Sequence, residues 1–376
     1  MEKFSAFRDP GTGIQPFLTP IPPSETDVIA AALLPIRHII GILRTSLILG
    51  LVFVYFLLVR GVCLVFVPIP PLARFVRWSC TALLTRSTLF LLGFWWIQAD
   101  VVTRKRGKTP PVSWRPSAGD IIVSNWVSWV EILWLAYRYD PIFVLPVSDV
   151  EDIAVTGTGS QPISYTPGRK TGTGSAAIST PQRPLSSPRT ILGFQTISLL
   201  SIIRLTGQTP QTLSNTQCHS IEDIRRSADR PIVVFPECTT SNGRGLLRFA
   251  NVFNNIDVPP KRYNVFVMCI RYDPPSLLKP SLSYTIPSTT FGLLQHVYHM
   301  TTALPAQSIS IRQLSLADSP SSQLFMVSEV VPNAGPGDDV LSEVCAVLIA
   351  QIGKMKKVGL GWEDKVAFLK FYRGRK

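Results

Sequence analysis

Two short stretches of the sequence carry side chains suited to chemistry. The first, "VSNWVSWVEIL" at residues 123–133, places an amide, hydroxyls and a carboxylate just after an apolar run. The second, "PIVVFPECTTSNGRG" at residues 231–245, ends an apolar run in a carboxylate, which hydroxyls and an arginine follow. Carboxylates serve in proton transfer, and the planar guanidinium of arginine suits phosphate. Both stretches therefore indicate a site for a small anionic ligand.

The first stretch has two interpretations, which the residues alone leave open. Ser128-x-x-Glu131 fits a capping box, in which Ser128 caps a helix and Glu131 reaches back to its first amides. The functional interpretation places Asn125, Ser128 and Glu131 at a helix N-terminus that follows a strand. Open α/β sheets bind their ligands at that position, outside the carboxyl ends of the strands.

The second stretch also has two interpretations. In one, the loop amides and Arg244 hold an anion, and the predicted phosphate-binding residues are Glu237, Thr239, Thr240, Ser241 and Arg244. In the other, Asn242-Gly243 forms a tight turn that faces solvent. A single loop of this kind does not decide between them.

The elements that must position these stretches follow an α/β pattern from residue 119 onward. Apolar, β-branched runs predict strands, at 121–124, 142–147, 231–236, 263–272, 282–286 and 324–331. Amphipathic spacing predicts helices between them, at about 128–138, 193–206, 219–229, 290–302 and 338–353. This alternation predicts a layered α/β domain, with a mixed, mostly parallel sheet and flanking helices.

Upstream of this domain, two oily runs predict a helical hairpin. Residues 46–67 contain one charge in 22 residues, and as a helix they span roughly 33 Å, about the thickness of a bilayer core. A second run, at 78–98, includes a Trp pair placed like an interfacial anchor. Arginines and lysines flank both runs. We therefore expect residues 37–110 to associate with a membrane, either by spanning it or by dipping into one leaflet. The alternative is a buried hairpin of a soluble domain.

The whole-chain composition supports the membrane over nucleic acid as a partner. The chain is 46% hydrophobic, yet 37 Lys and Arg against 24 Asp and Glu give a net charge of +13. Basic, oily chains suit anionic membrane surfaces, and no zinc-finger or RNA-binding signature is present. The six cysteines form no CxxC pair, so we expect neither a metal site nor a disulfide framework.

The rest of the chain divides by composition into three further segments. Residues 1–36 are polar and proline-rich, without the apolar core of a cleaved secretory signal. Residues 111–376 form the predicted α/β domain. Within it, residues 154–190 are rich in Gly, Ser, Thr and Pro and show no period, which predicts a flexible insertion.

The order of these features resembles a known family. An oily hairpin, "SNWVSWVE", and about a hundred residues later "VVFPECTTSNGRGLLRF" are similar to the glycerolipid (lysophosphatidate-type) acyltransferases, whose motifs are Asn-His-x-Ser-x-x-Asp and Phe-Pro-Glu-Gly-Thr-Arg-Ser. "MEKFSAFRDPGTGI" and "GLGWEDKVAFLKFY" look closest to the fungal branch linked to vacuolar protein sorting. The resemblance covers roughly residues 40–150 and 190–376, and it implies the acyltransferase fold for the α/β domain.

The resemblance also implies a reaction and a place in the cell. Acyl-CoA, the co-substrate, would acylate a lysophospholipid, with lysophosphatidate giving phosphatidate and no other cofactor taking part. The protein would work at the endoplasmic reticulum membrane or the lipid-droplet surface, with most of the chain in the cytosol. By residue matching, Asn125 and Ser128 keep their motif identities and Glu131 takes the Asp position. The second motif is kept at Phe235, Pro236, Glu237, Thr239 and Ser241, whereas Cys238 replaces its Gly and Thr240 its Arg.

Trp126 departs from the family at the position of the motif His, the general base. Indole has a donor but no basic nitrogen, and a general base is typically worth about 10²–10⁴ in rate. Two functions therefore stay open, along with a generic basic membrane scaffold. One is an acyltransferase in which Glu131 or another histidine acts as an atypical base. The other is a catalytically impaired, acyltransferase-like lipid-binding protein acting in lipid-droplet or vacuolar sorting function.

Overall fold

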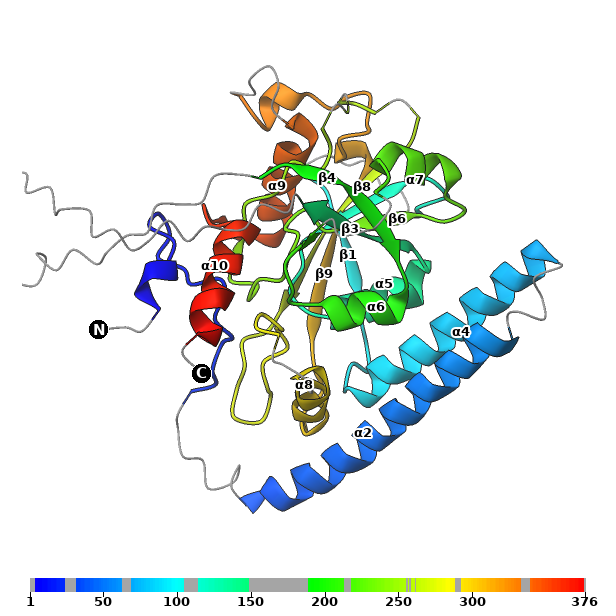
Figure 1. Cartoon of the computed structure of the whole chain (residues 1–376), viewed down its shortest axis with the longest axis vertical. Helices are drawn as coiled ribbons and strands as arrows, with labels where there is room; N and C mark the ends of the chain where they lie inside the picture. The colour runs from blue at the N-terminus through cyan, green and yellow to red at the C-terminus, as the bar shows by residue number, and fades with distance from the viewer. Residues whose placement is uncertain are drawn as a thin grey trace, which may run out of the picture.

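The structure is a computed structural model, shown in Figure 1. It describes residues 4–23, 32–62, 69–104, 114–148, 189–212, 218–254, 256, 258–260, 262–287, 292–332 and 339–374. The predicted insertion at 154–190 lies outside the described residues except for its last two positions.

A mixed sheet of eight strands forms the centre of the described part of the chain. The order is β1-β9-β8-β2-β6-β3-β4, with β5 beside β3. The strands are β1 (Ala99–Val102), β2 (Ile121–Ser124), β3 (Ile142–Ser148), β4 (Ile191–Ile197), β5 (Gln211–Thr212), β6 (Ile232–Val234), β8 (Val265–Tyr272) and β9 (Ile309–Leu314). The β3–β4 and β8–β9 pairs are antiparallel and the other pairs in this sheet are parallel. The predicted α/β architecture is thus confirmed.

Helices cover both faces of the sheet, so the molecule is layered (Figure 1). One apolar core includes residues of α5 (Val130–Tyr139), α6 (Leu199–Leu205) and α8 (Gly292–Thr301). The other includes residues of α7 (Ile221–Ser227) and α9 (Val340–Gly353). The C-terminal helix α10 (Trp362–Arg373) follows a two-stranded ladder of β7 (Gly245–Leu246) and β10 (Lys356–Lys357).

Most of the predicted elements are confirmed, and three are wrong. The strands at 121–124, 142–147, 231–236 and 263–272 exist with small shifts at their ends. The predicted helix at 193–206 is instead the end of β4 followed by α6, because Ile191–Ile197 pairs with the edge of β3. No strand forms at 282–286, where the amide of Tyr284 donates to Val127 O in a loop. At 324–331 the chain forms only the turn η4 (Val327–Glu329), with Leu324 and Met326 exposed.

The hairpin exists, but its helices begin earlier than the oily runs do. Helix α2 covers Leu34–Leu57 and continues as a wider turn over Leu58–Val62, and α4 covers Pro70–Leu91. Pro70 and Pro71 begin α4, where the missing proline N–H is not needed. The two helices run antiparallel along one side of the domain (Figure 1). Trp95 and Trp96 follow α4 and are exposed.

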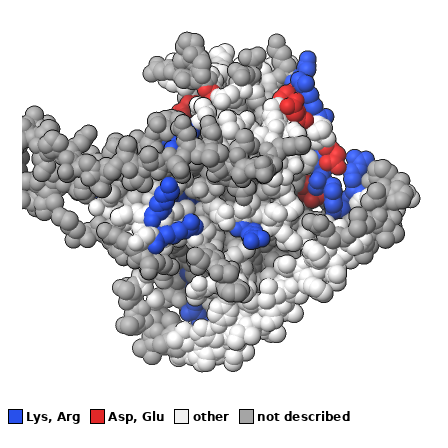
Figure 2. All heavy atoms as spheres, in the orientation of Figure 1, with Lys and Arg blue, Asp and Glu red and all other residues white. Residues whose placement is uncertain are grey.

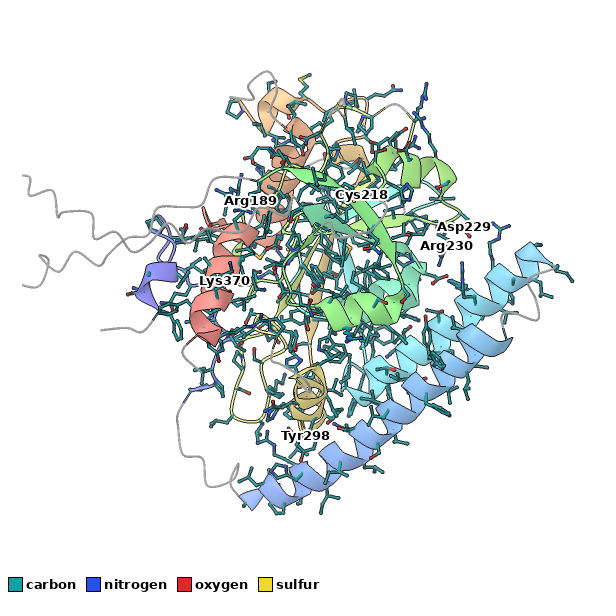
Figure 3. All side chains as sticks on the ribbon, in the orientation of Figure 1. Arg189, Cys218, Asp229, Arg230, Tyr298 and Lys370 are labelled. Carbon is teal, nitrogen blue, oxygen red and sulfur yellow. The ribbon has the colours of Figure 1, made fainter. Side chains whose placement is uncertain are left out.

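Several polar side chains of α2 contact the domain, while many of its large apolar side chains are exposed. Arg44 donates to Ala303 O at 2.9 Å, and the hydroxyls of Thr45 and Thr301 are 2.8 Å apart. His38 Nδ1 lies 2.7 Å from the hydroxyl of Tyr298, which α8 places beside α2 (Figure 3). Most of the exposed residues of α2 are large and apolar, among them Ile39, Ile42, Leu43, Phe53 and Phe56. This polarity is the reverse of that of a surface helix in water.

The hairpin gives the molecule a largely apolar edge. Figure 2 shows this edge, at the lower right, as a broad area without coloured residues. Among the described residues, α2 is the one helix whose length and composition suit a membrane span. At the far end of the hairpin, Arg77 lies 3.9 Å from both Asp140 and Asp229. Asp229 and Arg230 lie beside the start of α4 (Figure 3), which ties the hairpin to the domain at that end.

The N-terminal residues 4–23 pack onto the domain. Phe7 and Phe17 contact Phe368 of α10, with ring centroids 5.2 and 5.6 Å apart. The side chain of Asn242 donates to the carbonyls of Gln15 and Leu18. The described part of the polar N-terminal segment therefore lies against the loop that follows β6.

Candidate functional site

The two stretches singled out in the sequence meet at one edge of the sheet. Strands β2 and β6 are parallel neighbours, so the loops at their carboxyl ends lie together. The amide of Ser241 donates to Trp126 O at 2.9 Å, and the amide of Trp126 donates to Glu237 Oε1 at 2.9 Å. Two hydrogen bonds, one between backbone groups and one from a backbone amide to a carboxylate, thus join residues more than a hundred positions apart.

Glu237 is fully buried between the loops. Besides Trp126, it accepts a hydrogen bond at 3.2 Å from the amide of Leu247 on its second oxygen. Burial raises the pKa of Glu237 to about 8, and the two amide hydrogen bonds oppose that rise. Both oxygens are used inside the protein, so Glu237 clamps the two loops to each other.

The hydroxyl side chains of this loop are also buried and hydrogen-bonded. Thr239 donates to Gln208 O at 2.9 Å and Thr240 to Tyr284 O at 2.6 Å, while Ser241 accepts from the amide of Gly243. These groups stabilise the loop in the described conformation. Direct contact with a phosphate, which the sequence predicts for them, requires the loop to rearrange.

Lys365 supports the same loop from α10, and the sequence reasoning missed it. Its side chain is buried, and its amine donates to Thr240 O at 2.7 Å. Burial lowers the pKa of Lys365 well below its usual value, and the nearby Glu237 opposes that shift. The sequence offered one signal for this role: Lys365 occupies a position of the C-terminal helical stretch that faces inward, where a lysine is unusual.

Trp126 fills the position of the family's motif His with a packed indole. It is 1% exposed and stacks on Phe235, with ring centroids 4.9 Å apart and planes at 21°. Its Nε1 has no hydrogen-bond partner among the described residues. This side chain is part of the core and offers no proton acceptor.

Asn125 and Ser128 act on the backbone around them. The Asn125 amide exchanges two hydrogen bonds with the backbone of Ile270, at 2.9 and 2.8 Å, and so joins the end of β2 to β8. Ser128 Oγ accepts from the Val130 amide at 3.4 Å. The predicted capping box forms only in part: α5 begins after Trp129, without a side-chain cap from Ser128, but Glu131 does reach back to the backbone of Val127 and Ser128.

Glu131 differs from Asn125 and Ser128 because one of its hydrogen-bond partners, Tyr272, lines a pocket. One of its oxygens accepts from the Val127 amide at 2.6 Å, and the other accepts from the Tyr272 hydroxyl at 3.1 Å. The side chain is fully buried, and burial raises the pKa of Glu131 to about 8, against the opposing effect of its hydrogen bonds. Tyr272, the last residue of β8, lines the pocket beside it.

This pocket, called here the arginine pocket, has a volume of about 280 Å³. Arg244, from the loop after β6, and Arg271, near the end of β8, are among its lining residues. Arg271 also donates to Gly353 O at 2.8 Å, which fixes one of its nitrogens, whereas Arg244 is exposed. The rest of the lining is Pro20, Asn242, Gly243, Tyr272, Asp273, Pro274, Pro275, Ser281, Leu282 and Ser283. Two arginines and one aspartate among the lining residues give the lining a net positive charge, which suits a small anion.

A second, apolar pocket of about 250 Å³ lies between the hairpin and α5, α6 and α8. Its lining includes Val52, Leu133, Ile203 and Val297. Trp129 also lines it, and the Trp129 indole donates to His296 Nδ1 at 2.9 Å. This pocket suits a hydrocarbon chain.

None of the four histidines contacts either buried carboxylate through the hydrogen bonds of the described structure. His296 accepts from Trp129, and its other nitrogen lies 3.2 Å from Ser281 O. Burial lowers the pKa of His296 to about 4, so its ring is neutral at pH 7. His38 pairs with Tyr298, and His219 and His299 are exposed.

Comparisons with known proteins do not extend the family resemblance, which rests on the sequence motifs alone. A scan against protein-family models, a search of curated proteins and a search of solved structures found no match. Within the described residues, no group of three or more His, Cys, Asp and Glu is placed to hold a metal ion.

Proposed function

We propose that this chain is a membrane-bound acyltransferase that moves an acyl chain from acyl-CoA to lysophosphatidate, giving phosphatidate. It would act at the endoplasmic reticulum or lipid-droplet surface. The observation that carries the proposal is the link from the buried Glu131 carboxyl, through Tyr272, to the arginine pocket. A titratable acid with a perturbed pKa beside a cationic pocket is typical of an active site.

The arginine pocket supports a phosphate monoester as the acceptor's headgroup. Guanidinium groups bind phosphate oxygens through charge-assisted hydrogen bonds, and Arg244, from the loop after β6, and Arg271, in β8, both line the pocket. Asp273, the acid in the lining, accepts a hydrogen bond from Ser308. The pocket's balance of charge therefore favours an anion.

The hairpin and the apolar pocket support a lipid substrate. Burying each methylene of an acyl chain stabilises a complex by about 0.8 kcal/mol. The exposed apolar face of α2 is the surface expected to contact the bilayer, since in water it would be unfavourable. A lipid could then reach the apolar pocket from the side that the hairpin faces.

The test is acyl-CoA-dependent formation of phosphatidate by the purified full-length chain in detergent micelles. We expect turnover in the parent protein, and a loss of about 10²–10⁴ in rate in Glu131→Gln. Glu222→Gln, which changes a carboxylate paired with Arg225 on α7, is the matched control and should keep full activity. Absence of transfer with lysophosphatidate and a range of acyl-CoA chain lengths would contradict the proposal.

A second candidate is the catalytically impaired lipid-binding protein, and Trp126 specifically favours it. An indole packed on Phe235 cannot accept a proton. Under this alternative the parent binds lysophosphatidate without transferring acyl chains, and Trp126→His gains measurable transfer. An active parent whose activity falls in Trp126→His would argue against impairment.

A further inference from the structure

We propose that Tyr272 is the catalytic residue that contacts the acceptor, and that its hydroxyl relays the acceptor's proton to Glu131. This inference rests on the proposed acyl transfer and names the group that does the work of the missing motif His. In it, Glu131 is the final proton acceptor and never touches the lysolipid.

The first argument is the isolation of Glu131 from solvent. Its side chain is 0% exposed, and its oxygens are taken by the backbone of Val127 and Ser128 and by the Tyr272 hydroxyl. A substrate oxygen cannot reach this carboxylate without displacing one of these partners. Among the described residues, the hydrogen bond that connects Glu131 to the lining of the arginine pocket is the one from Tyr272.

The second argument is the position of Tyr272. It is the last residue of β8, it is partly exposed, and it lines the arginine pocket next to Arg271. A phosphate held at this arginine-bearing lining would keep the rest of the lysolipid in the pocket that Tyr272 lines. Holding a reacting group beside its catalytic partner is itself a large source of rate.

The third argument is the protonation state of each partner. Burial and the adjacent Glu131 raise the pKa of Tyr272 well above its usual value, so the phenol keeps its proton and acts as a relay. With a pKa of about 8, Glu131 is ionised in about a tenth of molecules at pH 7 and in most of them above pH 8. A base near the working pH is well matched to its task.

The step balances without a further reactant. The acceptor's O–H proton moves to the Tyr272 oxygen as the Tyr272 proton moves to Glu131 Oε2. The acceptor oxygen forms a bond to the thioester carbonyl carbon, and the carbon–sulfur bond breaks. The CoA thiolate then takes a proton from Glu131 back through Tyr272, which leaves an ester, a thiol and the ionised carboxylate.

The test compares Tyr272→Phe with Tyr139→Phe in the full-length protein. Tyr139 is a matched control, because it is another partly buried tyrosine whose hydroxyl takes part in a side-chain hydrogen bond, here from Gln313 at 2.9 Å. We expect Tyr272→Phe to lower kcat by about 10²–10⁴ while KM for lysophosphatidate changes less than about threefold. Tyr139→Phe should leave both constants within about twofold of the parent.

The pH–rate profile separates a relay from a merely structural role. In the parent, kcat should rise with pH up to about 8, and this rise should disappear in Tyr272→Phe and Glu131→Gln. Fluorotyrosine at position 272 keeps the ring and the hydroxyl, so it serves if Tyr272→Phe fails to fold, and it should shift the profile.

The outcomes distinguish the relay from the proposed function. An active parent with unchanged kcat in Tyr272→Phe, or an unchanged profile with fluorotyrosine, overturns the relay alone. A parent without acyl transfer overturns the proposed function, and the relay falls with it.

Discussion

Two buried glutamates, Glu131 and Glu237, lie at the carboxyl ends of neighbouring strands and differ in what they touch. Burial raises the pKa of each to about 8. Both oxygens of Glu237 accept backbone amides, whereas one oxygen of Glu131 accepts the hydroxyl of Tyr272, which lines the arginine pocket. A perturbed pKa alone therefore does not identify the reacting group. The contact that leads out of the core is the reason that Glu131, and not Glu237, is the proposed proton acceptor.

The largest expected difference between Glu237 and Glu131 is in what each contributes to the free energy of unfolding. Glu237→Ala leaves the buried amides of Trp126 and Leu247 without acceptors, and each unsatisfied group costs about 1–3 kcal/mol. We expect the free energy of unfolding to fall by about 2–6 kcal/mol, with activity lost because the loops separate. Thermal melting in detergent measures this.

The control for that experiment is Glu222→Ala on α7. Glu222 pairs with Arg225 and Arg226 near the surface, and such pairs are worth less than about 1 kcal/mol. Equal melting temperatures for Glu237→Ala and the parent would show that Glu237 is not a clamp, and would return it to the candidate phosphate ligands.

Sequence reasoning found the loops but not the partners that define them. The strands and helices around residues 121–147 and 231–236 are confirmed, because their apolar periods are regular. Tyr272 was unmarked, since it lies 141 residues from Glu131 and no spacing connects them. Lys365 was missed for the same reason, being 125 residues from Thr240. Such contacts arise only once the sheet order brings distant loops together.

The wrong strand at 282–286 has a related cause. Its residues are apolar enough for a strand, and Leu282 and Tyr284 are buried. Their backbone partners are the two site loops, since Tyr284 N donates to Val127 O and Tyr284 O accepts from Thr240. A local pattern predicts burial here, but tertiary contacts decide which backbone groups pair.

The next effect concerns the pH dependence of stability. A carboxyl whose pKa rises from 4.5 to about 8 on folding keeps its proton in the folded state, so stability falls as pH rises between those values. Each group contributes a slope of up to about 1.4 kcal/mol per pH unit. Lys365, whose pKa is lowered, acts in the opposite sense below pH 10.5.

We therefore expect the parent's melting temperature to fall between pH 5 and pH 8, and the fall to be smaller in Glu131→Gln and in Glu237→Gln. Glutamine keeps an acceptor oxygen and does not titrate. If only Glu237→Gln made the melting temperature less dependent on pH, Glu131 would be ionised throughout this range. The predicted rise of kcat with pH in the parent would then be absent. If neither variant changed the dependence, other groups would control it.

The smallest effect tests why the loop tolerates Cys238 where the family has glycine. Cys238 has φ of +56°, a left-handed conformation that glycine adopts without strain. Cys238→Gly relieves strain of about 1–2 kcal/mol but frees the unfolded chain by about 0.5–1 kcal/mol and removes a buried thiol. The net change should lie within about 1 kcal/mol, whereas Cys238→Val, β-branched at positive φ, should lower stability by about 2 kcal/mol or more. Melting temperatures of the three proteins measure this, and a large loss in Cys238→Gly would mean that packing of the thiol, and not the backbone conformation, governs this position.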